Sequence, residues 1–245
     1  MAKSIRKRKN LFKALGPGIL FASTAIGVSH LVQSTQAGAD YGFALLWAVI
    51  LANLFKYPFF EYGSRYANAT GTTLIDGYRK MGKWVLAIYF LINILSTFLV
   101  IAAVGFVTSG FMQNLFGIEN SNLTTLLLFG ICSLILISGK YNVLDKLIKI
   151  LGIVLLITTV FAVTLTFLKG PQGDLGLWSK SWFPDSTMGV FFLLALMGWM
   201  PTALDISAWS SLWIIEKEKS TGYKPSMKET LFDFNFGYLS TAFLS

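Results

Sequence analysis

The sequence runs MGVFFLLALMGWMPTALDISAWSSLWII from Met188 to Ile215. This stretch is long enough to cross a bilayer as a helix, which requires about 20 apolar residues. Pro201 interrupts the helix near its middle, because proline has no backbone N–H and its ring clashes with the carbonyl of Met197. Asp205 follows shortly after, and a carboxylate at mid-membrane depth costs roughly 2.5 to 3.5 kcal/mol and is usually functional. The stretch therefore predicts a discontinuous membrane helix that contributes to a binding site.

A second apolar segment, from Ile19 to Ala39, is interrupted in a similar way. Its middle reads Gly27-Val28-Ser29-His30 and includes the only histidine of the chain. Glycine weakens a helix, and a serine hydroxyl competes for backbone hydrogen bonds. Two broken helices in corresponding positions indicate a transporter with a site near the middle of the membrane. A proline kink and a glycine packing contact are the plainer alternative.

The composition excludes an ordinary soluble domain. Hydrophobic residues make up 54% of the 245 residues and charged residues only 13%, whereas soluble domains carry about 25% charged residues. Further apolar stretches bring the prediction to six membrane spans; they cover 41–60, 84–118, 120–139 and 150–168. The apolar run after Asp233 covers about 12 residues, which is too short to span. We therefore expect a polytopic all-α bundle and a chain that is a fragment of a longer transporter.

Basic residues alternate along the chain and predict the orientation of the spans. Lysine and arginine gather before the first span and after the second, fourth and sixth, whereas the loop at 111–122 has neither. This pattern places the N-terminus in the cytoplasm of a multi-pass plasma (inner) membrane protein. The net charge of +8 then reflects topology and contact with anionic lipid, so the lipid bilayer is the expected partner and nucleic acid is not.

The order of the spans predicts three regions. Residues 1–168 form a first membrane repeat of five spans, residues 169–185 form an extracytoplasmic link, and residues 186–245 begin a second repeat with span six and part of span seven. If the second repeat is inverted relative to the first, spans one and six are expected to be broken at the same depth.

Flanking motifs carry a resemblance to a known family. Gly16-Pro17-Gly18, Ala37-Gly38-Ala39-Asp40-Tyr41-Gly42 and Leu45-Leu46-Trp47 resemble the first two helices of the Nramp (natural resistance-associated macrophage protein) family of divalent-metal transporters. The resemblance covers most of the chain in layout. It implies a LeuT-type fold of two inverted five-helix repeats, and metal ligands that are the Asp and Asn of an Asp-Pro-Gly-Asn motif, a Met of a Met-Pro-His-Asn motif and a nearby Ala carbonyl.

The motif residues themselves differ from that family. An ungapped comparison puts Gly27 where the family has the Asp and His30 where it has the Asn. For helix six, Met200 keeps the Met if Met200-Pro201 is the anchor. If Ser210-Ser211-Leu212 is the anchor, Thr202 takes the place of the Met and Asp205 that of the Asn. Both registers remain open.

The residue types suggest a rebuilt transition-metal site. An imidazole from His30, a carboxylate from Asp205 and a thioether from Met200 would suit Mn²⁺ or Fe²⁺ better than Mg²⁺ or Ca²⁺. A lone membrane histidine is equally often a hydrogen-bond partner between helices. The residues predicted to face the substrate are Gly27, Ser29, His30, Trp199, Met200, Thr202 and Asp205.

Two further features concern proton coupling and the gating of transport. The resemblance implies a proton route through acids of helix three, yet residues 84–116 contain no Asp, Glu or His. Glu61 and Arg65 are four residues apart and share a helix face. They are expected to pair near the cytoplasmic end of span two, as a structural or gate contact.

Two other functions stay open beside a divalent-metal symporter. Trp199, Trp209 and Trp213 could enclose a small organic cation through cation–π contacts, and the loss of the usual ligands also fits a non-transporting membrane paralogue. We expect neither an enzyme nor a bound cofactor, because the sequence has no phosphate-binding loop, nucleophile elbow or HExxH motif.

Overall fold

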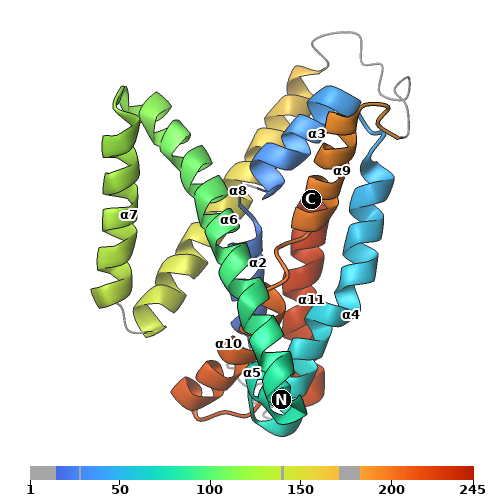
Figure 1. Cartoon of the computed structure of the whole chain (residues 1–245), viewed down its shortest axis with the longest axis vertical. Helices are drawn as coiled ribbons and strands as arrows, with labels where there is room; N and C mark the ends of the chain where they lie inside the picture. The colour runs from blue at the N-terminus through green and yellow to red at the C-terminus, as the bar shows by residue number, and fades with distance from the viewer. Residues whose placement is uncertain (1–14, 28, 139–140, 171–182) are drawn as a thin grey trace, which may run out of the picture. The chain divides into compact units, whose positions relative to one another are not determined.

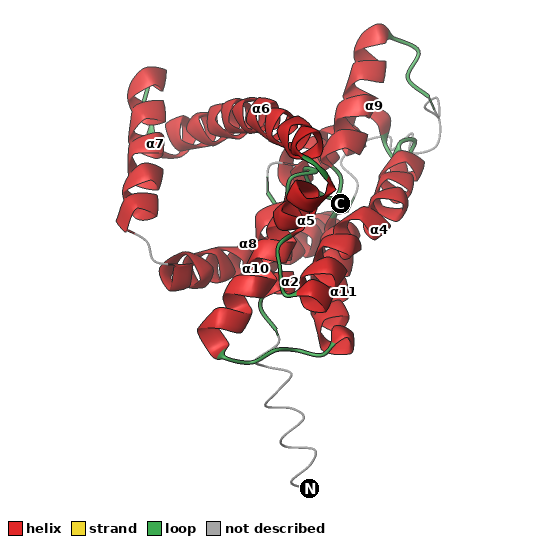
Figure 2. Ribbon diagram, turned by 60° about the horizontal axis from the view of Figure 1, so that its bottom comes forward, coloured by secondary structure: helices red, strands yellow, loops and turns green. Residues whose placement is uncertain are grey.

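The computed structural model describes residues 15–27, 29–138, 141–170 and 183–245. Every regular element in these ranges is helical and none is a strand, as Figure 2 shows. The predicted all-α class is therefore confirmed. The described elements are α2 (Pro17–Ala25), η1 (a π-helical turn, Ser29–Gln33), α3 (Ser34–Tyr41), α4 (Leu46–Thr70), α5 (Leu74–Met81), α6 (Lys83–Phe116), α7 (Ser121–Ser138), α8 (Tyr141–Lys169), α9 (Thr187–Trp199), α10 (Ile206–Thr221) and α11 (Met227–Leu244).

The chain divides into two compact units. The first comprises Met1–Gly77 with Ile148–Ser245, and the second comprises Tyr78–Leu147. The predicted division into residues 1–168, 169–185 and 186–245 concerns repeats and not compactness, so it stays a prediction; residues 171–182 of the link lie outside the described residues.

The second unit is built from two continuous helices, α6 and α7. They pack against each other; Gly105 admits the ring of Phe129, and the hydroxyls of Ser109 and Thr125 lie 3.0 Å apart. Helix α6 ends at Gly117, whose φ of 66° is left-handed, a conformation that glycine adopts without a Cβ penalty. Nearly all outward side chains of the two helices are apolar.

The first unit is organised around α4, which contacts α9, α10 and α11 (Figure 1). Helices α2 and α11 also lie side by side. A Cβ built on Gly18 would overlap the backbone of Asp233, and one built on Gly237 would overlap the backbone of Gly18. The two glycines therefore allow the backbones of α2 and α11 to touch, which is typical of helix packing in membranes.

Two apolar clusters form the core of the first unit. The α3–α9 cluster consists of Ala37, Leu45, Ala48, Val49, Ala52, Leu193, Leu196 and Met200. The α2–α10 cluster consists of Phe21, Ala25, Phe60, Ile206, Phe234 and Tyr238. Phe21 lies against the rings of Phe60, Phe234 and Tyr238, with centroids 5.5, 5.7 and 5.8 Å away, so the second cluster is largely aromatic.

Two described helices are by themselves long and apolar enough to cross a membrane, namely α6 and the Lys146–Lys169 part of α8. Helices α7 and α9 are apolar but shorter. The sequence predicts six spans, and the difference has three causes. The apolar helix of the predicted fourth span, Ser121–Ile137, is short. The predicted first and sixth spans are split into short helices by their breaks. In α4, polar side chains such as Asn53, Lys56 and Glu61 lower the mean hydropathy.

Candidate functional site

Both predicted helix breaks are present. Helix α2 ends at Ala25, and Ile26 is extended at φ −72° and ψ 102°; the π-helical turn η1 and α3 follow. Helix α9 ends at Trp199, Met200 is extended at φ −89° and ψ 133°, and α10 begins only at Ile206. The Met200–Pro201 peptide bond is cis. Figure 1 shows the extended connection between α9 and α10.

The two breaks lie at the same level of the first unit. Residues 26–33 connect Ala25 of the α2–α10 cluster to α3, which carries Ala37 of the α3–α9 cluster. Residues 201–205 connect Met200 of the α3–α9 cluster to Ile206 of the α2–α10 cluster. Each break thus passes from one apolar cluster to the other. The polar layer between the clusters is the candidate functional site.

His30 is buried in this layer, with 5% of its surface exposed. Its Nε2 lies 3.2 Å from the carbonyl oxygen of Thr241. A carbonyl oxygen can only accept, so Nε2 carries the proton and donates to α11. In this arrangement the imidazole ties η1 to α11, and Nε2 has no lone pair for a metal ion. The sequence leaves two roles open for His30, metal ligand and hydrogen-bond partner between helices, and the structure shows the hydrogen bond.

The predicted residues of the second break differ in their surroundings. Met200 is fully buried and packs in the α3–α9 cluster, and Thr202 is also buried, with 4% exposed. Asp205 and Trp199 are half-buried. One carboxylate oxygen of Asp205, Oδ1, is inaccessible and has no hydrogen-bond partner. That unpaired oxygen is the strongest candidate ligand among the predicted residues.

The remaining predicted residues of the first break contribute less. Gly27 is half-buried, and a Cβ added there would meet nothing within 4 Å. The side chain of Ser29 lies outside the described residues. Two further oxygens, Oε1 of Gln33 and Oδ1 of Asn53, are buried without a hydrogen-bond partner. Both belong to amide side chains; Gln33 ends η1, and Nδ2 of Asn53 donates to the carbonyl of Val49 and to Oγ of Ser245. Neither was singled out by the sequence.

Lys56 is the functional candidate that the sequence analysis missed. Its Nζ donates to three backbone carbonyls at the end of α9, those of Met197 at 2.8 Å, Gly198 at 2.6 Å and Met200 at 2.9 Å. Along α4, Lys56 lies between Ala52 of one cluster and Phe60 of the other, which is the level of the breaks. The sequence does contain a feature that could have identified Lys56, because it is the only charged residue between Asp40 and Glu61.

A preformed metal site built from charged ligands is not found. Within 15–27, 29–138, 141–170 and 183–245, no three His, Cys, Asp or Glu residues gather closely enough to hold a metal ion. Cys132 lies exposed on α7, in the other unit. A cation bound at the breaks would therefore need amide oxygens, backbone carbonyls or a thioether beside the carboxylate of Asp205.

The predicted pair of Glu61 and Arg65 is confirmed. Nε of Arg65 lies 2.9 Å from Oε2 of Glu61, and Nη2 lies 3.0 Å from Oε1, so the contact is bidentate. The hydroxyl of Tyr57 lies 3.2 Å from Oε1 of Glu61 and 2.7 Å from Oδ1 of Asn235. The pair thus belongs to a polar chain that connects α4 with α11. Its role as a gate stays a prediction.

Asp233 joins the start of α2 to α11. The side chain is buried, with 3% exposed, and its two carboxylate oxygens accept from the backbone N–H groups of Gly16 at 3.0 Å and Gly18 at 2.6 Å. An anion at a helix N-terminus is favoured by the helix dipole and satisfies N–H groups that have no partner within the helix. The first half of the broken helix is therefore fixed at its outer end.

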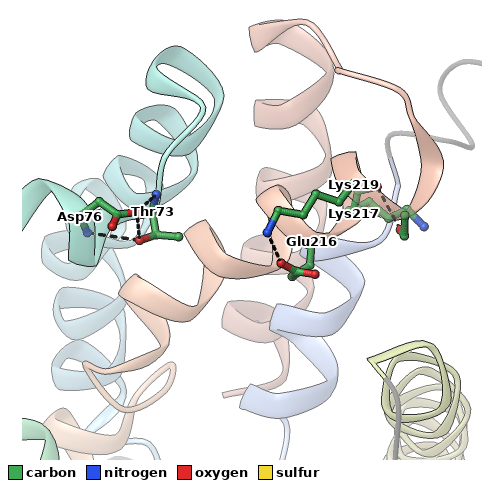
Figure 3. A network of polar contacts seen from close by, with 6 residues as sticks. Thr73, Asp76, Glu216, Lys217 and Lys219 are labelled. Atoms are coloured by element: carbon green, nitrogen blue, oxygen red, sulfur yellow. Dashed lines mark hydrogen bonds and ion pairs between the residues drawn. The ribbon is translucent and has the colours of Figure 1, made fainter.

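Charged groups of α5 and α10 form local polar contacts, which Figure 3 shows. The carboxylate of Asp76 accepts from the backbone N–H of Thr73 at 2.9 Å and from its hydroxyl at 2.6 Å. Nζ of Lys219 lies 2.6 Å from Oε1 of Glu216. These contacts cap α5 and support α10, and they supply no group to the helix breaks.

The tryptophans of α10 contact each other. The rings of Trp209 and Trp213 are 6.2 Å apart in an edge-to-face arrangement, and Trp213 packs against the α2–α10 cluster. Trp199 belongs to the end of α9. This geometry favours a packing role for Trp213 over a part in an aromatic cage.

These elements define a helical membrane protein with two discontinuous helices whose breaks meet at one level. The chain belongs to the Nramp family: the profile described as natural resistance-associated macrophage protein-like matches residues 18–243. The expected family is therefore confirmed. No solved structure matches the chain significantly.

Three relatives illustrate the range of similarity. An uncharacterized protein of Pasteurella multocida is 42% identical over 236 residues, 96% of this chain and 54% of that protein. The metal transporter Nramp3 of Oryza sativa subsp. japonica is 30% identical over 172 residues, 66% of this chain and 29% of that protein. The divalent metal cation transporter MntH of Erwinia tasmaniensis is 33% identical over 78 residues, 31% of this chain and 19% of that protein. The chain thus spans about half the length of the Pasteurella relative and less of the others.

Proposed function

We propose that this chain contains the substrate-binding site of a secondary transporter for a divalent metal ion. The observation that carries the proposal is the meeting of two helix breaks at one level, between two apolar clusters. Broken helices expose backbone carbonyls and helix ends that bind ions at the midplane of secondary transporters. The names of two relatives, a divalent metal cation transporter and a metal transporter, support a metal ion as the substrate.

The surrounding architecture follows from the same proposal. The protein is a multi-pass plasma (inner) membrane protein with its N-terminus in the cytoplasm and a LeuT-type arrangement of inverted repeats. Rocking of one repeat against the other would open the site to each side in turn. The Glu61–Arg65 pair and its link through Tyr57 to Asn235 serve as a gate contact between α4 and α11.

The available ligands favour a transition metal over Mg²⁺. The carboxylate of Asp205, whose Oδ1 has no hydrogen-bond partner, would supply the negative charge. Met200, at the second break, would supply a thioether. His30, at the first break, would supply an imidazole. A thioether and an imidazole suit Mn²⁺ or Fe²⁺ better than the harder ions. For binding, the Met200 side chain would have to turn out of the α3–α9 cluster, and His30 would have to release the carbonyl of Thr241.

Symport with protons requires groups outside α6, because residues 83–116 contain no Asp, Glu or His. Asp205 is the nearest described carboxylate to the breaks in sequence. We therefore assign it both roles, as metal ligand and as the group that exchanges a proton for the ion. No bound cofactor is needed for this cycle.

The test is Mn²⁺ binding and uptake by the full-length protein, measured by calorimetry in detergent and by uptake into proteoliposomes. We expect Asp205→Asn to weaken Mn²⁺ binding by at least about tenfold, since it removes the charged ligand while keeping the side-chain size. Glu216→Gln is the matched control, because Glu216 pairs with Lys219 away from the breaks, and it is expected to bind like the parent.

If the parent protein neither binds nor transports Mn²⁺ or Fe²⁺, the proposal of a metal ion as substrate is wrong. An organic cation would then be tested with a quaternary ammonium probe. Quenching of tryptophan fluorescence that disappears in Trp199→Phe would indicate the cation–π alternative. No binding of either kind would leave a non-transporting paralogue.

A further inference from the structure

The carbonyl end of α9 is already occupied by a cation. A helix C-terminus carries a partial negative charge and carbonyls without intrahelical donors. In discontinuous transporter helices, such ends coordinate the transported or coupled cation. Here the Lys56 ammonium donates to the carbonyls of Met197, Gly198 and Met200 at 2.6 to 2.9 Å.

These contacts use the full donor capacity of the lysine. An ammonium has three N–H donors, and three carbonyl oxygens accept from Nζ. All three carbonyls come from the last residues of one helix end, across 141 to 144 positions of sequence. Three carbonyl oxygens around one ammonium resemble the coordination of an ion more than a single hydrogen bond to the nearest polar atom.

The position of Lys56 makes its charge relevant to the substrate. It lies on α4 at the level of the two breaks, and one of its acceptors is the carbonyl of Met200, the first residue of the second break. A divalent ion beside Met200 would compete for the same carbonyl oxygens. It would also be repelled by the ammonium, because like charges a few ångströms apart repel each other strongly where the effective dielectric constant is well below that of water.

We propose that Lys56 is a tethered cation that fills the carbonyl end of α9 and competes with the metal ion for the site at the breaks. The inference rests on the proposed function, since it names what controls ion binding at that site. The ion and the ammonium occupy the carbonyl end alternately. Lys56 therefore lowers the affinity of the site for the divalent ion whenever its side chain is docked.

A purely structural cap would behave differently. If Lys56 only satisfied the carbonyls of α9, any side chain with suitable donors would replace it, and Mn²⁺ affinity would not depend on charge. If Lys56 competes with the ion, removing its charge would strengthen Mn²⁺ binding even where donors remain. Charge and donor capacity must therefore be separated.

The first experiment compares Lys56→Gln and Lys56→Arg with the parent, as full-length proteins titrated with Mn²⁺ in a calorimeter. Gln keeps N–H donors without the charge, and Arg keeps both. We expect Lys56→Gln to bind Mn²⁺ at least about tenfold tighter than the parent, which corresponds to 1.4 kcal/mol, and Lys56→Arg to stay near the parent.

A chemical version controls for folding. These 245 residues contain a single cysteine, Cys132, which lies in the other unit. Cys132 and any cysteine elsewhere in the full-length protein are replaced by serine, so Lys56→Cys provides one alkylation site. An aminoethyl group restores an ammonium of the length of lysine, and a propyl group restores the length without the charge. Both products share one background, so any folding defect of the substitutions is common to both. We expect the propyl form to bind Mn²⁺ at least about tenfold tighter than the aminoethyl form.

The outcomes separate the two proposals. Mn²⁺ binding that is equal in the parent, Lys56→Gln and both alkylated forms would overturn the competition while leaving the metal transporter intact. No binding in any form, including the neutral ones, would overturn both. Binding by the parent that becomes at least about tenfold tighter in both forms without a charge at position 56 would support the competition.

Discussion

The two units differ in the continuity of their helices and in the polar side chains between them. The second unit keeps α6 and α7 continuous, and its one described hydroxyl contact between helices joins Ser109 to Thr125. The first unit interrupts two helices and places polar side chains beside the interruptions, among them the buried His30 and the half-buried Asp205 and Lys56. Polar side chains thus accompany both breaks.

The difference has a physical reason. A continuous helix satisfies its own backbone, so its side chains can all be apolar. Each break frees N–H groups and carbonyls that need partners within the protein. Lys56 donates to carbonyls at the end of α9 that the second break frees. His30, in the first break, donates to a carbonyl of α11, and Asp233 of α11 accepts from N–H groups at the outer start of α2. The stability of the first unit should consequently depend on single polar residues, whereas that of the second should not.

The largest effect is expected for Asp233→Ala. The substitution leaves the N–H groups of Gly16 and Gly18 buried without an acceptor, and we expect a loss of about 3 kcal/mol in the free energy of unfolding. Asp76→Ala is the matched control, because Asp76 caps α5 at an exposed site and should cost about 1 kcal/mol. Thermal unfolding in detergent measures both. Equal losses would contradict the special dependence of α2 on its buried cap.

The next comparison of the two units uses one glycine-to-alanine substitution in each. A Cβ on Gly63 of α4 would overlap the carbonyl oxygen of Ser207 and lie 2.8 Å from Oγ of Ser210, whereas one on Gly110 of α6 would meet nothing within 4 Å. We expect Gly63→Ala to destabilise the protein by about 1 to 3 kcal/mol. Gly110→Ala should be neutral or stabilise by up to about 1 kcal/mol, because alanine favours the helix. A destabilising Gly110→Ala would show that α6 is packed as closely as α4.

Local chemistry explains what the sequence predicted correctly. Pro201 and Gly27 disturb the helix in which they stand, so both breaks could be located from the chain alone. The pairing of Glu61 with Arg65 follows from their spacing on one helix. Each of these features depends on residues within about one helical turn.

Contacts between distant segments explain what the sequence did not predict. Asp233 caps a helix start that lies 215 to 217 residues away, and the three acceptors of Lys56 lie at least 141 residues away. Nothing in the neighbourhood of either residue identifies its partners. The burial of Met200 in the α3–α9 cluster is likewise a result of helix packing, which the Met-Pro motif does not encode.

The smallest effect is expected for the hydrogen bond that joins α6 to α7. In a double-mutant cycle of Ser109→Ala and Thr125→Val, we expect a coupling of about 0.6 kcal/mol, the average for hydrogen bonds between membrane helices. The matched cycle in the first unit is Asn68→Ala with Thr230→Val. There, Nδ2 of Asn68 donates to Oγ1 of Thr230 at 2.9 Å and to the carbonyl of Pro225 at 2.8 Å.

Because both Asn68 and Thr230 are buried and the amide holds two acceptors, its coupling should exceed that of the Ser109–Thr125 pair. Thermal unfolding of the four proteins in each cycle gives both couplings. If the Ser109–Thr125 coupling proved the larger, burial would not be what makes polar contacts strong in this chain. The contrast between the units would then lie in backbone continuity alone, since α6 and α7 would depend on a polar pair as much as α4 and α11 do.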